Sequence, residues 1–254
     1  MKKYSLLLLV TLSNFALADL GPTRANVGKI DVKQGKNYRL DGDLSYLLNS
    51  TKSHGETNKK QNLAANLLFQ RQVGVWGQEL RAEAVSANDN GNSGSNVERY
   101  MLSGKALHRS SDTIYQFAKL QGDKDLSSNF DYQISLTGGV GMDILKDEKQ
   151  NLTAEVGAGY RYSKERYDPR DDFNEAIGTA GLYYNYKFNE RVSFNQDLSY
   201  EFGDKAQILR SRSSVSASLT DTISGLVSYQ IKDTQADVGN SRDSLLSVGL
   251  RYTH

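Results

Sequence analysis

The chain has 254 residues, with 31 Lys and Arg against 30 Asp and Glu, and it contains no cysteine. The balanced charge gives no indication of a nucleic-acid partner, and without cysteine the fold cannot depend on disulfides. The chain is hydrophilic on average and, beyond its N-terminus, lacks a run of 18 apolar residues, which excludes a helical membrane protein. A transmembrane β-barrel remains possible, because only alternate residues of its strands face lipid.

The N-terminus has the features of a cleaved secretory signal peptide. Lys2 and Lys3 precede an apolar run from Leu6 to Leu12 and the small-residue site Ala16-Leu17-Ala18. The apolar run is well short of the roughly 20 residues that a spanning helix needs. We therefore expect residues 1–18 to be removed.

The next segment, residues 19–37, has no strong period and contains one of the two prolines, Pro22. We interpret it as a periplasmic N-terminal segment. From residue 38 to residue 254, polar turn signals divide the chain into segments of strand length, which predicts a single barrel domain.

The segments alternate in character with a period of two. In the clearest one, residues 131–144, the even-numbered positions are mostly apolar and the odd-numbered positions mostly polar. This period indicates strands rather than helices. We predict about twelve antiparallel strands, centred on residues 39–50, 61–72, 76–87, 97–109, 112–122, 129–144, 150–163, 174–188, 191–203, 207–219, 222–233 and 243–254.

The fifth segment has the weakest pattern. Tyr115 and Phe117 fall on the opposite face from Ile114, Ala118 and Leu120. A β-bulge, which inserts one extra residue into a strand, would explain such a change of phase. The sequence therefore predicts a bulge in this strand.

The connections alternate in length, as they do in bacterial barrels with short periplasmic turns and longer outer loops. Residues 203–205 are shorter than this rule predicts for an outer loop. With the export signal, the aromatic residues near strand ends and the even strand number, the pattern predicts an all-β protein, a closed antiparallel barrel in the outer membrane of a Gram-negative bacterium. The longer polar stretches are residues 51–60, 86–96, 122–128, 164–173 and 233–242, and the tight ones are 109–112, 189–191 and 220–222.

The C-terminal residues resemble the insertion signal that the outer-membrane assembly machinery recognises. Gly249, Leu250 and Tyr252 supply its glycine and its alternating apolar and aromatic positions, whereas His254 stands where phenylalanine is usual. We expect Tyr252 to contribute most to assembly.

A wider resemblance covers most of the chain. Gly42-Asp43-Leu44-Ser45-Tyr46, Gly157-Ala158-Gly159-Tyr160-Arg161-Tyr162 and the closing Leu250-Arg251-Tyr252 are similar to strand motifs of the YdiY-like family of salt-induced outer-membrane proteins. The resemblance implies an outer-membrane barrel and an abundance that responds to salt. These motifs are strand signatures and imply no catalytic residues.

The face predicted to point inward carries charges of both signs. Two interpretations remain open, a permeation path for small solutes and a packed network of ion pairs that fills the lumen. Strand number does not separate them, because about eight strands give a filled interior and 16 to 18 leave an aqueous channel. The candidate lumen residues are Arg39, Asp41, Asp43, Glu79, Arg81, Glu83, Arg99, Lys105, Asp131, Glu155, Arg161, Asp197, Glu201, Arg210, Arg212 and Arg251.

An outer-membrane enzyme of lipase or protease type is the alternative from another class. Of the three histidines only His54 lies in an outer loop, where Asp171 or Asp172 from a second loop would have to serve as its partner. A solvated loop histidine is the simpler interpretation, so we do not expect an enzyme. A passive surface or adhesion protein is the third alternative.

Charged residues in the outer loops suggest two further interactions. Asp123, Asp125, Asp168, Asp171 and Asp172 offer the oxygen ligands that calcium and magnesium prefer, although solvated acidic loops are the more ordinary interpretation, and no metal or cofactor is expected. The basic residues of the loops can bind phosphates of outer-membrane lipid and lipopolysaccharide through charge-assisted hydrogen bonds. These residues are Lys164, Arg166 and Arg170.

Overall fold

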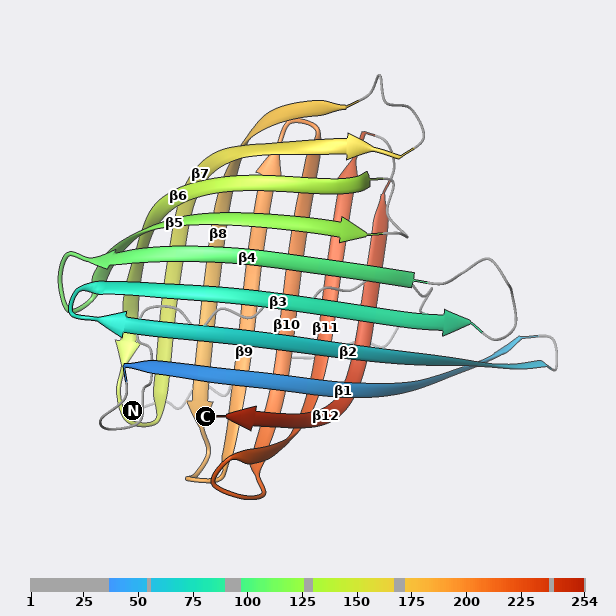
Figure 1. The fold of residues 1–254 in the computed structure, drawn as a ribbon, viewed down its shortest axis with the longest axis horizontal. Helices are drawn as coiled ribbons and strands as arrows, with labels where there is room; N and C mark the ends of the chain where they lie inside the picture. The colour runs from blue at the N-terminus through green and yellow to red at the C-terminus, as the bar shows by residue number, and fades with distance from the viewer. Residues whose placement is uncertain are drawn as a thin grey trace, which may run out of the picture.

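The computed structural model describes residues 37–53, 56–89, 97–125, 130–166, 172–237 and 240–253. These residues form twelve antiparallel strands that close into one barrel (Figure 1), which confirms the predicted fold. Each strand pairs with its neighbours in sequence, and β1 pairs with β12. The strands are β1 (Tyr38–Ser53), β2 (Glu56–Val73), β3 (Trp76–Asp89), β4 (Val97–Arg109), β5 (Ile114–Asp125), β6 (Phe130–Lys146), β7 (Gln150–Glu165), β8 (Phe173–Lys187), β9 (Val192–Gly203), β10 (Ala206–Ser218), β11 (Ile223–Ala236) and β12 (Ser241–Thr253).

The strands are strongly tilted. In Figure 1 the wall that contains β1 to β5 crosses the wall that contains β9 to β11 at a large angle, as tilted strands on opposite sides of a barrel do. Because the strand number is even, Tyr38 at the start of β1 and Thr253 at the end of β12 lie at the same end as the short turns. No helix of the described residues is long and apolar enough to cross a membrane.

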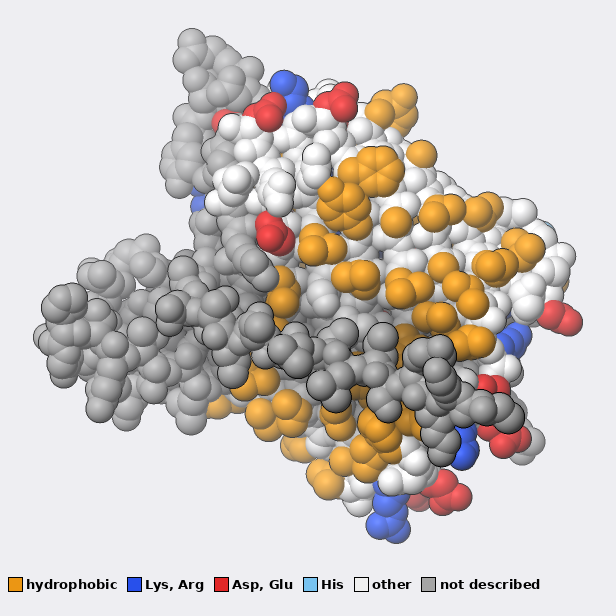
Figure 2. Space-filling view, turned by 180° about the vertical axis from the view of Figure 1, so that it is seen from behind, with side chains coloured by type: hydrophobic (Ala, Val, Ile, Leu, Met, Phe, Trp, Pro, Cys, Tyr) orange, Lys and Arg blue, Asp and Glu red, His pale blue; other side chains and the backbone are white. Residues whose placement is uncertain are grey.

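The outer surface of the barrel is apolar. Leu102 and Tyr160 are 66% and 71% exposed to solvent as residues, and exposed leucines, valines and isoleucines recur on nearly every strand. Figure 2 shows these side chains as a broad area on the outer wall. Aromatic pairs occur toward both ends, for example Tyr184 with Tyr186 and Tyr132 with Tyr162. This distribution fits a surface that faces lipid between two interfacial aromatic girdles.

The bulge predicted for the fifth strand is wrong. β5 pairs with β4 and β6 in continuous register, and Tyr115 and Phe117 simply point into the barrel, where both are buried. They pack with Leu107 into a small apolar cluster. An aromatic residue in a membrane barrel is therefore not always on the lipid side.

Bulges occur instead in β6. The register with β7 shifts between Phe130 and Tyr132 and again between Asp143 and Leu145. At the first shift Phe130 takes the buried side and packs edge-on against Phe173, with ring centroids 5.9 Å apart. The alternation of apolar and polar residues cannot reveal a register shift at the end of a strand, because the apolar face that defines the alternation stops there.

Strands extend into several of the predicted outer loops, whose bounds are therefore too wide. The ladder of β1 and β2 continues to the pair Ser53 and Glu56, inside the predicted loop 51–60, and β5 continues to Asp125, inside the predicted loop 122–128. Beyond the membrane both faces of a hairpin meet water, so a ladder can continue with polar residues on both sides. The apolar pattern therefore marks only the membrane-embedded part of each strand.

Four of the tight turns use one local device. The side-chain oxygens of Ser111, Asp147, Asn189 and Thr220 each accept hydrogen bonds from the backbone N–H groups two and three residues later, over 2.7 to 3.3 Å. Such side chains substitute for the next backbone partner and fix the turn. The bonds from the side chain and backbone of Gln150 and the backbone of Lys149 lower the pKa of Asp147.

The remaining tight turn depends on glycine. Gly74, between β2 and β3, has a φ of 58°, a conformation that side chains with a Cβ rarely adopt. Its carbonyl accepts a hydrogen bond of 2.7 Å from the side chain of Gln72. This turn and the four above keep one end of the barrel compact.

Inward-facing glycines allow β6 and β7 to approach closely. A Cβ on Gly159 would lie 2.0 Å from the carbonyl oxygen of Leu136, and one on Gly139 would lie 2.2 Å from that of Val156. Both neighbours are backbone atoms, so they cannot move aside independently of the sheet. The curvature of this wall therefore requires residues without a side chain.

We predict that Gly159→Ala lowers the free energy of unfolding by about 1–3 kcal/mol, the usual cost of forcing extra atoms into a packed site. The matched control is Gly42→Ala, because a Cβ at Gly42 would meet nothing within 4 Å. Urea unfolding of the refolded barrel in lipid vesicles, followed by the fluorescence of Trp76, the sole tryptophan, measures both. Equal midpoints for the two variants would contradict the prediction.

Candidate functional site: the charged lumen

Most of the predicted lumen residues lie inside the barrel, on the face opposite the apolar surface. Asp131 is the exception, because it lies at the first bulge of β6 and, among the described residues, takes part in none of the ion pairs. Arg39, Glu79 and Glu201 line the interior and remain partly accessible. The buried members are Asp41, Asp43, Arg81, Glu83, Arg99, Lys105, Glu155, Arg161, Asp197, Arg210, Arg212 and Arg251.

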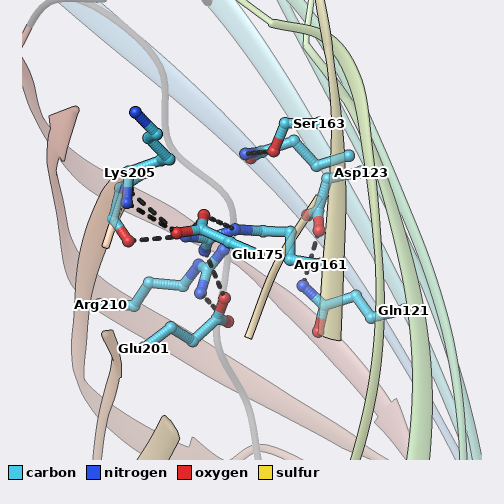
Figure 3. Close-up of polar contacts among 10 residues, drawn as sticks. Gln121, Asp123, Arg161, Ser163, Glu175, Glu201, Lys205 and Arg210 are labelled. Carbon is cyan, nitrogen blue, oxygen red and sulfur yellow. Dashed lines mark hydrogen bonds and ion pairs between the residues drawn. The ribbon is translucent and has the colours of Figure 1, made fainter. Parts of the chain in front are cut away.

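Arg161 of β7 is the centre of the largest cluster. Its guanidinium donates to Glu175 of β8 at 2.6 and 3.0 Å, to Glu201 of β9 at 3.1 Å and to the carbonyl of Ala206 at 2.6 Å. Arg210 of β10 donates to the other oxygen of Glu201. Figure 3 shows the two arginines on either side of the glutamates. Four neighbouring strands are thus joined by charge-assisted hydrogen bonds.

A second cluster joins β4, β5 and β7. The ammonium of Lys105 pairs with Glu155, and the hydroxyl of Tyr115 donates to the same carboxylate at 2.6 Å. The Lys105 ammonium also lies 4.5 Å from the centre of the Phe117 ring. The ion pair reaches across the wall over two intervening strands, so it narrows the lumen at this level.

The aromatic rings of the lumen lie against its wall. A Cβ on Gly141 would fall 2.1 Å from the Tyr115 ring, one on Gly139 would fall 2.9 Å from the Phe117 ring, and one on Gly181 would fall 2.4 Å from the Tyr183 hydroxyl. Each ring therefore covers a glycine. The space along the barrel axis is left to the longer charged side chains.

A third cluster spans the seam where the barrel closes. Asp43 of β1 accepts hydrogen bonds from Arg251 of β12 at 2.6 and 3.2 Å, and Arg212 of β10 lies 3.7 Å away. Asp41 accepts a bond of 2.7 Å from the hydroxyl of Thr253 and pairs with Arg39 at 3.0 Å. The first and last strands are thus joined by side chains as well as by backbone.

The remaining acids lie close to arginines. Glu79 pairs with Arg81 at 3.2 Å and accepts a bond of 2.9 Å from Gln70. Glu83 is buried, and Arg81, Arg99 and Arg212 are the positive charges acting on it. Buried charges of one sign are thus matched by charges of the other sign nearby.

Two cavities follow the lumen. The central one has a volume of about 80 Å³ and is lined by residues of both main clusters, among them Lys105, Lys119, Glu155, Glu201 and Arg210. The other has a volume of about 720 Å³ and opens at the end with the short turns. One water needs roughly 10–15 Å³ measured this way, so both cavities can hold water.

Several residues considered for catalysis, metal binding, lipid binding or assembly lie outside the described part of the chain. His54, Asp168, Arg170, Asp171 and His254 lie there, as do residues 1–36 with the predicted signal peptide. Of the candidates that are described, Asp172 accepts hydrogen bonds from the hydroxyl of Tyr162 at 3.1 Å and the N–H of Glu165 at 2.9 Å. These bonds fix the junction of β7 with its loop, which is a structural role.

The placement of Asp123 in an outer loop is wrong. Asp123 belongs to β5 and accepts a bond of 2.7 Å from Gln121, which lies two residues earlier on the same inner face. Within the described ranges, no group of three or more His, Asp and Glu side chains is arranged to hold a metal ion. Arg166 donates to the carbonyl of Phe130 at 3.4 Å, and Lys164 lies at the outer end of β7.

Sequence reasoning missed Glu175, Lys119 and Tyr115. Glu175 lies on the inner face of β8, but Ile177 and Tyr183 are bulky on that same face, so the apolar pattern of this strand is ambiguous. Lys119 follows from the alternation of β5 once Tyr115 and Phe117 are accepted as inward-facing. The unbroken period of two through residues 114–125, with the odd-numbered positions facing inward, could have identified Tyr115 and Lys119 as lumen residues.

The C-terminal residues of the predicted assembly signal form the end of β12. Leu250 and Tyr252 point outward, and each is about half exposed. Gly249 faces β1, where a Cβ would lie 2.4 Å from the carbonyl oxygen of Leu44. Recognition by the assembly machinery stays a prediction.

Comparison with known proteins adds the family and the fold. The model of a family described as "Protein of unknown function, DUF481" matches residues 43–254, and no curated protein sequence matches the chain. The NanC porin superimposes with a TM-score of 0.50 at 15% identity, over 84% of this chain and 97% of its own. The COG4313 outer membrane channel from Pseudomonas putida F1 gives 0.48 at 11% identity, over 88% and 99%. The likeness to NanC shows the fold of an outer-membrane β-barrel.

We predict that Arg161→Met lowers the free energy of unfolding by about 3–5 kcal/mol, because it leaves the buried carboxylate of Glu175 without its ion-pair partner. In the control Lys205→Met, the lost ion pair with Asp237 is exposed (side chains 55% and 66% accessible), so the expected loss is below about 1 kcal/mol. Urea unfolding in vesicles measures both. Similar losses for the two variants would contradict a stabilising role for the Arg161 cluster.

Proposed function

The chain belongs to the DUF481 family, and we propose that this member is an outer-membrane channel whose lumen gives small solutes a narrow, water-filled path. The observation that carries the proposal is the pair of polar cavities that follow the lumen, about 80 and 720 Å³ in volume. A barrel packed solid would leave no such space. Twelve strands also enclose more room than the roughly eight whose side chains fill a barrel.

The lining supports a path for polar solutes. Charged groups of both signs face the central cavity, and the larger cavity is lined by serine, threonine, asparagine and charged residues. The aromatic rings of Tyr115, Phe117 and Tyr183 rest over glycines of the wall instead of crossing the axis. A polar solute can therefore exchange its hydration for hydrogen bonds along the way.

The central cavity sets the size limit. Two ion pairs, Lys105 with Glu155 and Arg210 with Glu201, face it from different parts of the wall. A space of about 80 Å³ holds a few water molecules. The path therefore suits inorganic ions and small organic solutes, and these charged pairs form its constriction.

We predict that the refolded protein produces discrete conductance steps in a planar lipid bilayer and that Arg210→Ser increases their size. The shorter side chain widens the constriction, while Glu201 keeps its partner Arg161. The control is Arg191→Ser, in an exposed turn outside the lumen, and its steps should match those of the wild type. A silent bilayer from protein shown to be folded would mean a filled barrel and would refute the channel.

We also propose a site for lipopolysaccharide on the outer wall. By register, Tyr100, Lys124, Tyr132 and Lys164 lie side by side on β4, β5, β6 and β7 near their outer ends, and the Lys164 ammonium lies 5.7 Å from the centre of the Tyr132 ring. Two lysines beside aromatic rings at this depth suit the phosphates of an outer-leaflet lipid.

A groove beside this row suits an acyl chain of the same lipid. Its volume is about 750 Å³. Small residues form its floor, and larger apolar residues border it. The floor consists of Ala65, Ala82, Ala84 and Gly122, and the border includes Leu67, Leu102 and Ile134.

We predict that the double variant Lys124→Gln and Lys164→Gln weakens binding of lipopolysaccharide to the detergent-solubilised barrel, measured by calorimetric titration. Lys146→Gln with Lys187→Gln, at the opposite end of the barrel, removes the same charge and should leave binding intact. Equal affinity of both double variants would refute the site without bearing on the channel.

A further inference from the structure

Lys119 differs from Lys105 and Arg210, two other basic residues that line the central cavity. It lies on the inner face of β5 between Phe117 and Gln121, and its side chain is half-buried beside the cavity. Among the described residues it has no hydrogen bond or ion pair, whereas Lys105 pairs with Glu155 and Arg210 pairs with Glu201. A cation without a partner in a confined space is costly to the fold.

The basic residues that line the central cavity together with Lys119 include Arg81, Lys105 and Arg210. The charged groups that act on Lys119 most strongly are Glu201, Arg81, Lys105 and Arg210. Glu201 is already held by Arg161 and Arg210. Glu155 and Glu79 are likewise paired, with Lys105 and Arg81, so none of these acids forms an ion pair with Lys119.

The buried acid Glu83 does not offset this charge. It also lines the central cavity, but the cations that act on it are Arg81, Arg99 and Arg212. Asp123, which lies on the same inner face of β5, accepts a hydrogen bond from Gln121. The lining of the central cavity as a whole has six basic residues against five acidic ones, so it carries a positive excess.

We propose that Lys119 is an anion-binding site within the lumen, which binds small anions such as chloride, phosphate or the carboxylate of a small organic acid as they pass. The proposal rests on the channel function proposed above and names its solute class. The lysine ammonium has three donors and no acceptor, so it forms charge-assisted hydrogen bonds with an anion that enters without displacing an existing partner. A single uncompensated charge at a narrow place then sets the ion selectivity.

Reversal potentials in a KCl gradient test the selectivity. The wild type should pass chloride better than potassium, and Lys119→Gln should lower the permeability ratio roughly tenfold, the lower end of the range over which charge-lined clefts concentrate counter-ions. Lys119→Glu should reverse the preference, and Lys119→Arg should retain it. The control Lys149→Gln removes a lysine from an exposed turn outside the lumen and should leave the ratio unchanged.

A measurement without a bilayer separates this site from the channel itself. Inorganic phosphate that binds the folded state should raise the melting temperature of the wild type in detergent, and this rise should be lost in Lys119→Gln but kept in Lys149→Gln. A silent bilayer with the phosphate effect intact would refute the channel and keep the site. Conductance with the same selectivity in wild type and Lys119→Gln, or a phosphate effect that survives in Lys119→Gln, would refute the site.

Discussion

The structure depends on the pairing of β1 with β12, which closes the hydrogen-bonded ladder. Lipid offers no partner to a backbone N–H or C=O group, so an open edge in the membrane would leave a row of unsatisfied groups. The seam is secured by the absence of a side chain on Gly249, which lets β12 approach Leu44, and by the ion pair of Asp43 with Arg251. Closure then divides every strand into one face for lipid and one for the lumen.

Because of this division, the charged side chains of the strands must be accommodated inside the barrel. Charged side chains cannot face the hydrocarbon, so they gather inside, where water is scarce and each charge needs an opposite charge nearby. Arg161 meets this need for Glu175 and Glu201 together, across three neighbouring strands. The inward glycines complete the arrangement, because they receive the rings of Tyr115 and Phe117 on the wall and leave the axis to polar groups.

The sequence predicted the features that alternation determines and missed those that depend on the register between strands. The period of two identified the barrel and the lipid-facing residues such as Leu136 and Val156. It did not reveal that Arg161 meets Glu175, because that pairing depends on how far β7 and β8 are staggered. It misjudged Tyr115, because aromatic residues were expected on the lipid face, and Asp131, because a bulge shifts the period there.

Stability and permeation make opposite demands on a charge in the lumen. A fully paired charge stabilises the barrel but has little attraction left for a passing solute, whereas an unpaired charge attracts solute at a cost to the fold. Under the proposed channel function, the barrel separates the two roles. Its arginines, whose planar groups can bind two carboxylates at once, join the strands around Glu201 and Asp43. Lys119, a single flexible ammonium beside them, can lack a carboxylate because the neighbouring pairs already hold the wall together.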